Sequence, residues 1–201
     1  MKAVFLDYAS LDQNDLDFSE LHAVFENLTL YPASTEEQVL ERIQEVDVVI
    51  TNKVRISAEV IQQLPQLKLI LISATGTNNV DLVQAKKSGI VVCNCQAYGT
   101  SAVAQHTLML MLALSTSVIQ YHQAVQKGEW QKAQQFCLLD FPIVELAGKT
   151  LGIIGYGELG QAVAQLAKAF GMQIMVGALP NRPQREGRVQ LDVLLSQADY
   201  V

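Results

Sequence analysis

Three glycines, Gly155, Gly157 and Gly160, follow the pattern G-x-G-x-x-G, the clearest chemical signal in the sequence. Residues 151–154, before this pattern, are typical of a strand, and residues 159–169, after it, are typical of a helix. A glycine pattern between a strand and a helix is the context in which it binds a dinucleotide. The first glycine permits a tight turn, the second lets a pyrophosphate approach the backbone, and the third allows close helix–strand packing. The predicted cofactor-binding loop is Gly155-Tyr156-Gly157-Glu158-Leu159-Gly160, and the alternative is a glycine-rich turn that binds nothing.

The residues after the next strand leave the choice between NAD and NADP open. An NAD site usually places Asp or Glu about 20 residues beyond the glycines, on the ribose hydroxyls. Here residues 175–180 are uncharged, and the next charged side chains are Arg182 and Arg185. These arginines could meet the 2′-phosphate of NADP, although a solvated basic loop explains them equally well.

The framework around this loop is predicted to be α/β. Short runs rich in Val, Ile and Leu alternate with helical patterns, which favours parallel strands covered on both faces. Five strands are predicted at residues 3–7, 29–31, 47–51, 67–73 and 90–94, and Thr35 and Ser57 are predicted N-caps of helices between them. This rhythm is flavodoxin-like. A second unit is predicted from strands at 149–155 and 173–177, a helix at 191–197 and a third strand opening at 198.

Residues 88–126 contain no Asp, Glu, Lys or Arg, and the larger part of this stretch belongs to a helical pattern from about 101 to 127. At about 1.5 Å per residue, one helix of that length would run about 40 Å, too long for one small domain. We therefore predict a helix that bridges two domains, with the domain boundary near residues 96–101. Polar residues such as Gln105 and Thr116 interrupt the apolar run, so no membrane span is predicted.

Composition excludes several classes of protein. Half of the 201 residues are apolar and 17% are charged, which argues against intrinsic disorder. Residues 1–50 carry 11 acidic and 2 basic side chains, a net charge of −9. Because the whole chain has a net charge of −6, residues 51–201 have a net charge of +3. Such a protein is not expected to bind nucleic acid. The cysteine count is odd, so reduced thiols and a cytoplasmic location are expected.

Other chemically suggestive residues are predicted to be structural. Cys93 and Cys95 lie one residue apart with no second ligand pair, so no metal site is predicted. His106 falls within a predicted helix, and His22 and His122 have no partner motif. The Leu and Met residues between 108 and 114 are predicted to form core or a dimer seam.

Four further motifs accompany the glycine loop: TNKV at 51–54, SATGTNNVD at 73–81, YGTSAVAQH at 98–106 and ELAGKTLG at 145–152. In order and interval, the five motifs resemble those of the D-isomer-specific 2-hydroxyacid dehydrogenases, in particular the glycerate dehydrogenase/hydroxypyruvate reductase branch. The resemblance extends over the whole chain. It implies a flavodoxin-like substrate domain at 1–98, followed by the N-terminal part of a Rossmann domain at 99–201.

The resemblance also implies roles for individual residues. The loop Ala74-Thr75-Gly76 would offer backbone N–H groups to a substrate carboxylate, and the loop with Asn52 and Lys53 would close over it. Thr100 and Val103 would lie near the nicotinamide. The implied reaction interconverts a 2-oxo acid of the hydroxypyruvate or glyoxylate type and a D-2-hydroxy acid of the glycerate type, with NAD or NADP. A homodimer is implied through the long helix.

In the family, the catalytic arginine, glutamate and histidine lie beyond the third Rossmann strand, whereas this sequence ends at Val201, at the start of that strand. We therefore assign no catalytic residue here. The expectation is a C-terminally truncated enzyme whose Rossmann part is incomplete and which is inactive by itself. The alternative is a catalytically silent dinucleotide-binding or dimerising protein of the same fold.

Overall fold

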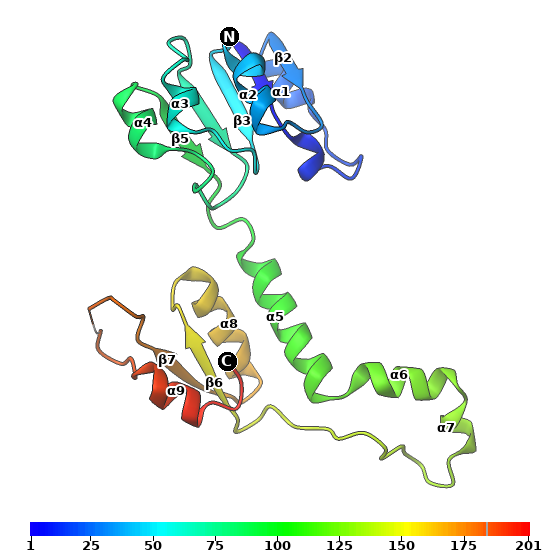
Figure 1. Ribbon diagram of the computed structural model, residues 1–201. Helices are drawn as coiled ribbons and strands as arrows, with labels where there is room; N and C mark the ends of the chain where they lie inside the picture. Colours follow the sequence, from blue (N-terminus) through cyan, green and yellow to red (C-terminus); the bar gives the residue numbers. More distant parts are fainter. Residues whose placement is uncertain (184) are drawn as a thin grey trace. The chain divides into compact units, whose positions relative to one another are not determined.

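The computed structural model describes residues 1–183 and 185–201. The chain divides into two compact units, Met1–Ala97 and Tyr98–Val201 (Figure 1). The sequence pattern predicted a boundary near residues 96–101, and the family resemblance placed it between residues 98 and 99. Each unit has its own sheet and its own buried core, so each is described by itself.

The first unit is built on a five-stranded parallel sheet with the order β2-β1-β3-β4-β5. The strands are β1 (Lys2–Phe5), β2 (Asn27–Leu30), β3 (Val48–Thr51), β4 (Leu69–Ile72) and β5 (Val91–Asn94). All five predicted strands are present, with ends shifted by up to two residues. Because every pair is parallel, the carboxyl ends of the strands lie at one edge of the sheet.

Both faces of this sheet are buried, as the apolar strands predicted. Along β1, Val4 packs into one hydrophobic cluster, while Ala3 and Phe5 pack into the other. The helical elements are a 3₁₀ turn (Tyr8–Ser10), α1 (Ser19–Val24), α2 (Glu36–Ile43), α3 (Ala58–Ile61) and α4 (Leu82–Lys87).

The predicted N-caps of this unit are confirmed. The backbone N–H of Thr35 donates to Gln38 Oε1 at 3.1 Å, one half of the capping box at α2. Ser57 Oγ accepts the N–H of Val60 at 3.4 Å at the start of α3.

The second unit contains a two-stranded parallel sheet of β6 (Thr150–Ile154) and β7 (Gln173–Gly177). Its helices are α5 (Thr100–Ser115), α6 (Val118–Gln126), α7 (Glu129–Lys132), α8 (Glu158–Ala169) and α9 (Leu191–Gln197). Single parallel bridges extend the sheet on both sides: Val189 lies beside Gly177 of β7, and Tyr200 beside Leu151 of β6. The third strand predicted from 198 is therefore a lone bridge that lies next to β6. This arrangement follows the Rossmann order, in which the third strand borders the second and the fourth borders the first.

Helix α9 packs on this sheet through Leu194, which has no exposed surface. A Cβ built on Gly152 would lie 2.6 Å from Leu194 Cδ2, and one on Gly177 would lie 3.1 Å from Leu194 Cδ1. Glycine at both strand positions therefore makes room for the leucine.

The single helix predicted for 101–127 is wrong, because the chain bends by 62° between α5 and α6. Three consecutive hydroxyl side chains lie at the bend. Ser115 Oγ and Thr116 Oγ1 each donate to a carbonyl four residues back, and Ser117 Oγ donates to the carbonyl of Pro142, all at 2.7 Å. Ser117 itself has a left-handed φ of +51°. These side-chain bonds compete with the helical ladder and end α5.

No one helix within residues 1–183 and 185–201 has the length and hydropathy to cross a bilayer. The bent pair of α5 and α6 reaches that length and hydropathy only when the two helices are taken together.

Candidate functional site

The glycine loop joins β6 to α8, in the predicted strand–loop–helix context. Gly155 has a φ of +100°, a conformation that L side chains rarely adopt. Gly157 is the N-cap of α8, and a Cβ built on it would meet nothing within 4 Å. At Gly160 a Cβ would lie 2.3 Å from the carbonyl oxygen of Gly155 and 3.2 Å from Ile153 Cγ2. The three glycines thus serve a turn, an open approach and a close packing contact.

A cavity of about 520 Å³ lies against this loop. Its lining is basic and partly apolar, and it comprises Gly155, Tyr156, Gly157, Leu179, Arg182, Pro183, Arg185 and Arg188. No acidic side chain is among these described lining residues. Together with the N–H groups at the start of α8, the arginines make the cavity suited to an anion.

Three of these lining residues were not predicted as site residues: Leu179, Pro183 and Arg188. The spacing of the arginines, at 182, 185 and 188, was a visible signal, because it repeats a positive charge every three residues after β7. Nothing in the sequence pattern distinguished Leu179 and Pro183 from ordinary loop residues.

The first turn of α5 is linked to the glycine loop by a side-chain hydrogen bond. Thr100 Oγ1 donates to Glu158 Oε1 at 2.5 Å, and Glu158 is the first residue of α8. Val103 lies one turn further along α5 with 43% of its surface exposed, and Leu159 is 48% exposed. All the predicted cofactor residues lie in the second unit, and Thr100 contacts the glycine loop directly.

The predicted substrate residues lie at the carboxyl edge of the sheet in the first unit. The loop Ala74-Thr75-Gly76 follows β4, and Asn94 Nδ2 from the end of β5 donates to the carbonyl of Thr75 at 2.7 Å. Ala74 is buried, whereas Thr75 and Gly76 are exposed. In the described part of the chain, the N–H groups of Thr75 and Gly76 donate to no protein acceptor. Two adjacent open amides of this kind can bind a carboxylate.

The loop after β3 is fixed by hydrogen bonds at its backbone. The N–H groups of Asn52 and Lys53 donate to the carboxylate of Asp7 at 2.8 and 2.7 Å. Asn79 Nδ2 donates to the carbonyl of Val54 at 3.2 Å, which ties this loop to the one after β4. Asn52 is buried and Lys53 is exposed. Asp7 was not predicted to belong to this site.

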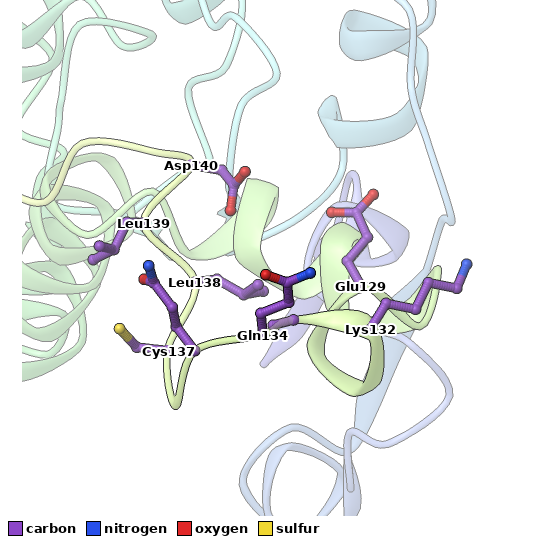
Figure 2. A pocket seen from close by; sticks show the side chains of 9 residues that line it. Glu129, Lys132, Gln134, Cys137, Leu138, Leu139 and Asp140 are labelled. Atoms are coloured by element: carbon purple, nitrogen blue, oxygen red, sulfur yellow. The ribbon is translucent and has the colours of Figure 1, made fainter.

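A separate hollow of about 550 Å³ lies within residues 129–140. Figure 2 shows Glu129 and Lys132 on one side of it and Cys137 and Leu139 on the other, so the polar groups do not converge on one point. Neither this hollow nor the cavity at the glycine loop has a histidine among its described lining residues.

Comparison with known proteins identifies relatives of the whole chain. A family model described as "D-isomer specific 2-hydroxyacid dehydrogenase, catalytic domain" matches residues 4–181. A glycerate dehydrogenase of Methylorubrum extorquens is 42% identical over 200 residues, with 100% of this chain and 62% of the relative covered. A hydroxypyruvate reductase of Blautia hydrogenotrophica is 38% identical over 207 residues, with 100% and 64% covered.

Solved structures confirm the predicted fold class. An acyclic imino acid reductase (Bsp5) in complex with NADPH and D-Arg matches with a TM-score of 0.79 at 26% identity. The match covers 99% of this chain and 63% of that protein. The chain thus spans slightly less than two thirds of the length of the relatives that it matches.

Proposed function

The chain belongs to the D-isomer specific 2-hydroxyacid dehydrogenase family, and we propose that it binds NADPH and a small 2-oxo acid as part of a D-2-hydroxyacid dehydrogenase. The observation that carries this proposal is the cavity lined by three arginines beside the glycine loop. The names of the relatives, glycerate dehydrogenase and hydroxypyruvate reductase, support a substrate of the hydroxypyruvate or glyoxylate type.

The described residues fit the cofactor. Glycine is needed at 160, because a Cβ there would collide with the backbone, and Gly157 leaves the start of α8 open to the pyrophosphate. Arg182 and Arg185 supply positive charge for the 2′-phosphate, which favours NADP over NAD. Thr100 and Val103 are assigned to the nicotinamide end. When bound, NADPH supplies a hydride for the carbonyl carbon of the substrate.

The carboxylate of the 2-oxo acid is assigned to the loop Ala74-Thr75-Gly76. Its two open amides provide hydrogen bonds to an anion without the bulk of a side chain. Asn52 and Lys53 form the second wall, and the exposed ammonium group of Lys53 adds a positive charge there. A small substrate is favoured because its donors, the amides of Thr75 and Gly76 and the side chain of Lys53, all lie at the same edge of one sheet.

Protonation of the substrate oxygen is assigned to none of these residues. None of the three histidines lines the glycine-loop cavity, and we assign no general acid among the described residues. We therefore expect these 201 residues to bind both molecules without turning them over.

The test is to add NADPH to the protein while following cofactor fluorescence, and then to add hydroxypyruvate. We expect a saturable change with NADPH and no loss of NADPH absorbance after hydroxypyruvate. A protein that does not bind NADPH would contradict the cofactor assignment. Oxidation of NADPH would show that these residues include a general acid, and His106 would be the first to substitute.

A homodimer is proposed as well. Leu108 and Met111 of α5 are buried, but Leu114, Ile119, Phe136 and Leu139 are between 60% and 92% exposed. Apolar surface of this extent favours contact with a second copy. Light scattering should give about twice the monomer mass of 22.1 kDa, whereas a mass equal to one chain would contradict the dimer. The three cysteines are free thiols, which suits a reducing compartment such as the cytoplasm.

A further inference from the structure

Asp7 is a buried carboxylate in the first unit, only 5% exposed, just beyond the end of β1. No ion pair to Asp7 is found within the described ranges. A carboxylate without a cation is costly to bury unless hydrogen bonds replace its water. The groups that solvate Asp7 therefore indicate why an acid is at this position.

Those groups are two consecutive backbone amides from another strand end. Asn52 N–H donates to Oδ1 of Asp7 at 2.8 Å, and Lys53 N–H donates to Oδ2 at 2.7 Å. Each carboxylate oxygen thus accepts one amide of the loop that follows β3. Hydrogen bonds to an ionised acceptor are stronger than neutral ones, so the pair fixes the course of this loop.

Ser10 closes a ring of hydrogen bonds around the same carboxylate. Asn52 Nδ2 donates to Ser10 Oγ at 2.9 Å, and Ser10 Oγ donates to the backbone carbonyl of Asp7 at 2.7 Å. Both the backbone and the side chain of Asn52 are therefore held from the segment after β1. The loop that carries Lys53 is therefore held by this distant segment as well as by its own turn, in which Thr51 Oγ1 accepts the N–H of Val54 at 3.1 Å.

The backbone amides at this edge of the sheet are of two kinds, those bonded to Asp7 and those open to a ligand. The N–H groups of Asn52 and Lys53 are occupied by Asp7, whereas those of Thr75 and Gly76 are open. Asn79 joins the two loops through its bond to the carbonyl of Val54. The loop after β3 and the loop with the open amides are thus linked by a hydrogen bond.

We infer that Asp7 is a positioning residue for the 2-oxo acid site: its carboxylate holds the Asn52–Lys53 loop in the form that binds substrate. The inference rests on the proposed function, because that function places the substrate carboxylate beside this loop. Asp7 acts through the loop and does not touch the substrate. Loosening the loop lowers the fraction of protein ready to bind, and the apparent affinity falls by the same factor.

The test compares Asp7→Asn with the matched variant Asp47→Asn in the whole chain. Asparagine has the shape of aspartate but replaces one acceptor oxygen with an NH₂ donor, which cannot accept the second amide. Asp47 likewise accepts a backbone N–H, that of Lys2 at 3.0 Å, but it precedes β3 at the opposite edge of the sheet. NMR titration with glyoxylate in the presence of NADPH gives the Kd, and amide hydrogen exchange reports on Asn52 and Lys53.

For Asp7→Asn we expect glyoxylate to bind about tenfold more weakly, equivalent to about 1.4 kcal/mol, with faster exchange at Asn52 and Lys53. The Kd for NADPH should be unchanged, because a general loss of fold would weaken both ligands. Asp47→Asn should leave glyoxylate binding as in the wild type. Ser10→Ala keeps the buried charge and should weaken glyoxylate two- to threefold, which tests the ring even if Asp7→Asn does not fold.

The outcomes separate the inference from the proposed function. If the wild type does not bind glyoxylate, the substrate assignment fails and the inference fails with it. If the wild type binds and Asp7→Asn or Ser10→Ala binds equally well, only the positioning role is overturned. Equal weakening by Asp47→Asn would also overturn it, since the effect would then be one of general stability.

Discussion

The substitutions Gly157→Ala and Gly160→Ala should separate the binding role of the glycine loop from its packing role. A Cβ at 160 would lie 2.3 Å from the carbonyl oxygen of Gly155, which is backbone and cannot rotate away. The start of α8 must therefore move, and overpacking of this kind costs about 1–3 kcal/mol of folding free energy. A Cβ at 157 meets nothing within 4 Å, and the φ of −88° suits alanine. That substitution should leave stability within about 0.5 kcal/mol.

The two variants should have opposite profiles in two assays. Chemical denaturation should give Gly160→Ala a free energy of unfolding that is lower by about 1–3 kcal/mol and leave Gly157→Ala like the wild type. NADPH titration should show at least tenfold weaker binding for Gly157→Ala, because the methyl group occupies the approach of the pyrophosphate. If Gly157→Ala binds NADPH as well as the wild type does, the assignment of this loop to the cofactor is refuted.

Three further predictions concern other parts of the second unit. Arg182→Ala should weaken NADPH roughly tenfold, by the loss of about 1.5 kcal/mol, and leave NADH binding unchanged in parallel titrations. Leu194→Ala should lower the free energy of unfolding by about 2–5 kcal/mol, measured by denaturant, because the side chain is fully buried against β6 and β7. The backbone N–H of Thr150, and then Lys149, hold the pKa of Asp199 below its usual value of 3.8. Its contribution to stability is therefore present above that pH and is lost as pH falls through the lower folded value. When stability is measured as pH is lowered through this range, Asp199→Asn should lose less stability than the wild type.

The sheet of the first unit was predictable because its strands are short, apolar and buried on both faces. A run such as 48–51, whose four residues are all buried, follows the pattern of a parallel strand covered on both faces. The helix break at Ser117 was not predicted, although three successive hydroxyl residues signal it in retrospect. Hydropathy alone treats such residues as neutral, and the bond of Ser117 to a carbonyl depends on the return of the chain at Pro142.

The site was predictable where its signal is local. The glycine loop is a compact motif within one strand–helix unit, and the family resemblance that it contributed to is confirmed by the match over residues 4–181. Asp7 carries no such signal, because it lies 45 residues from Asn52 and joins it only through the pairing of β1 and β3. A hydrogen bond from a backbone amide leaves no trace in the sequence of the donor.

The most direct test of the account is a side-by-side fluorescence titration of the protein with NADPH and NADH. The arginine-lined cavity and the absence of an acidic residue from its described lining predict saturable binding of both cofactors, with NADPH at least tenfold tighter. Failure to bind either cofactor, or NADH binding as tightly as NADPH, would contradict the central claim that this cavity is an NADP site.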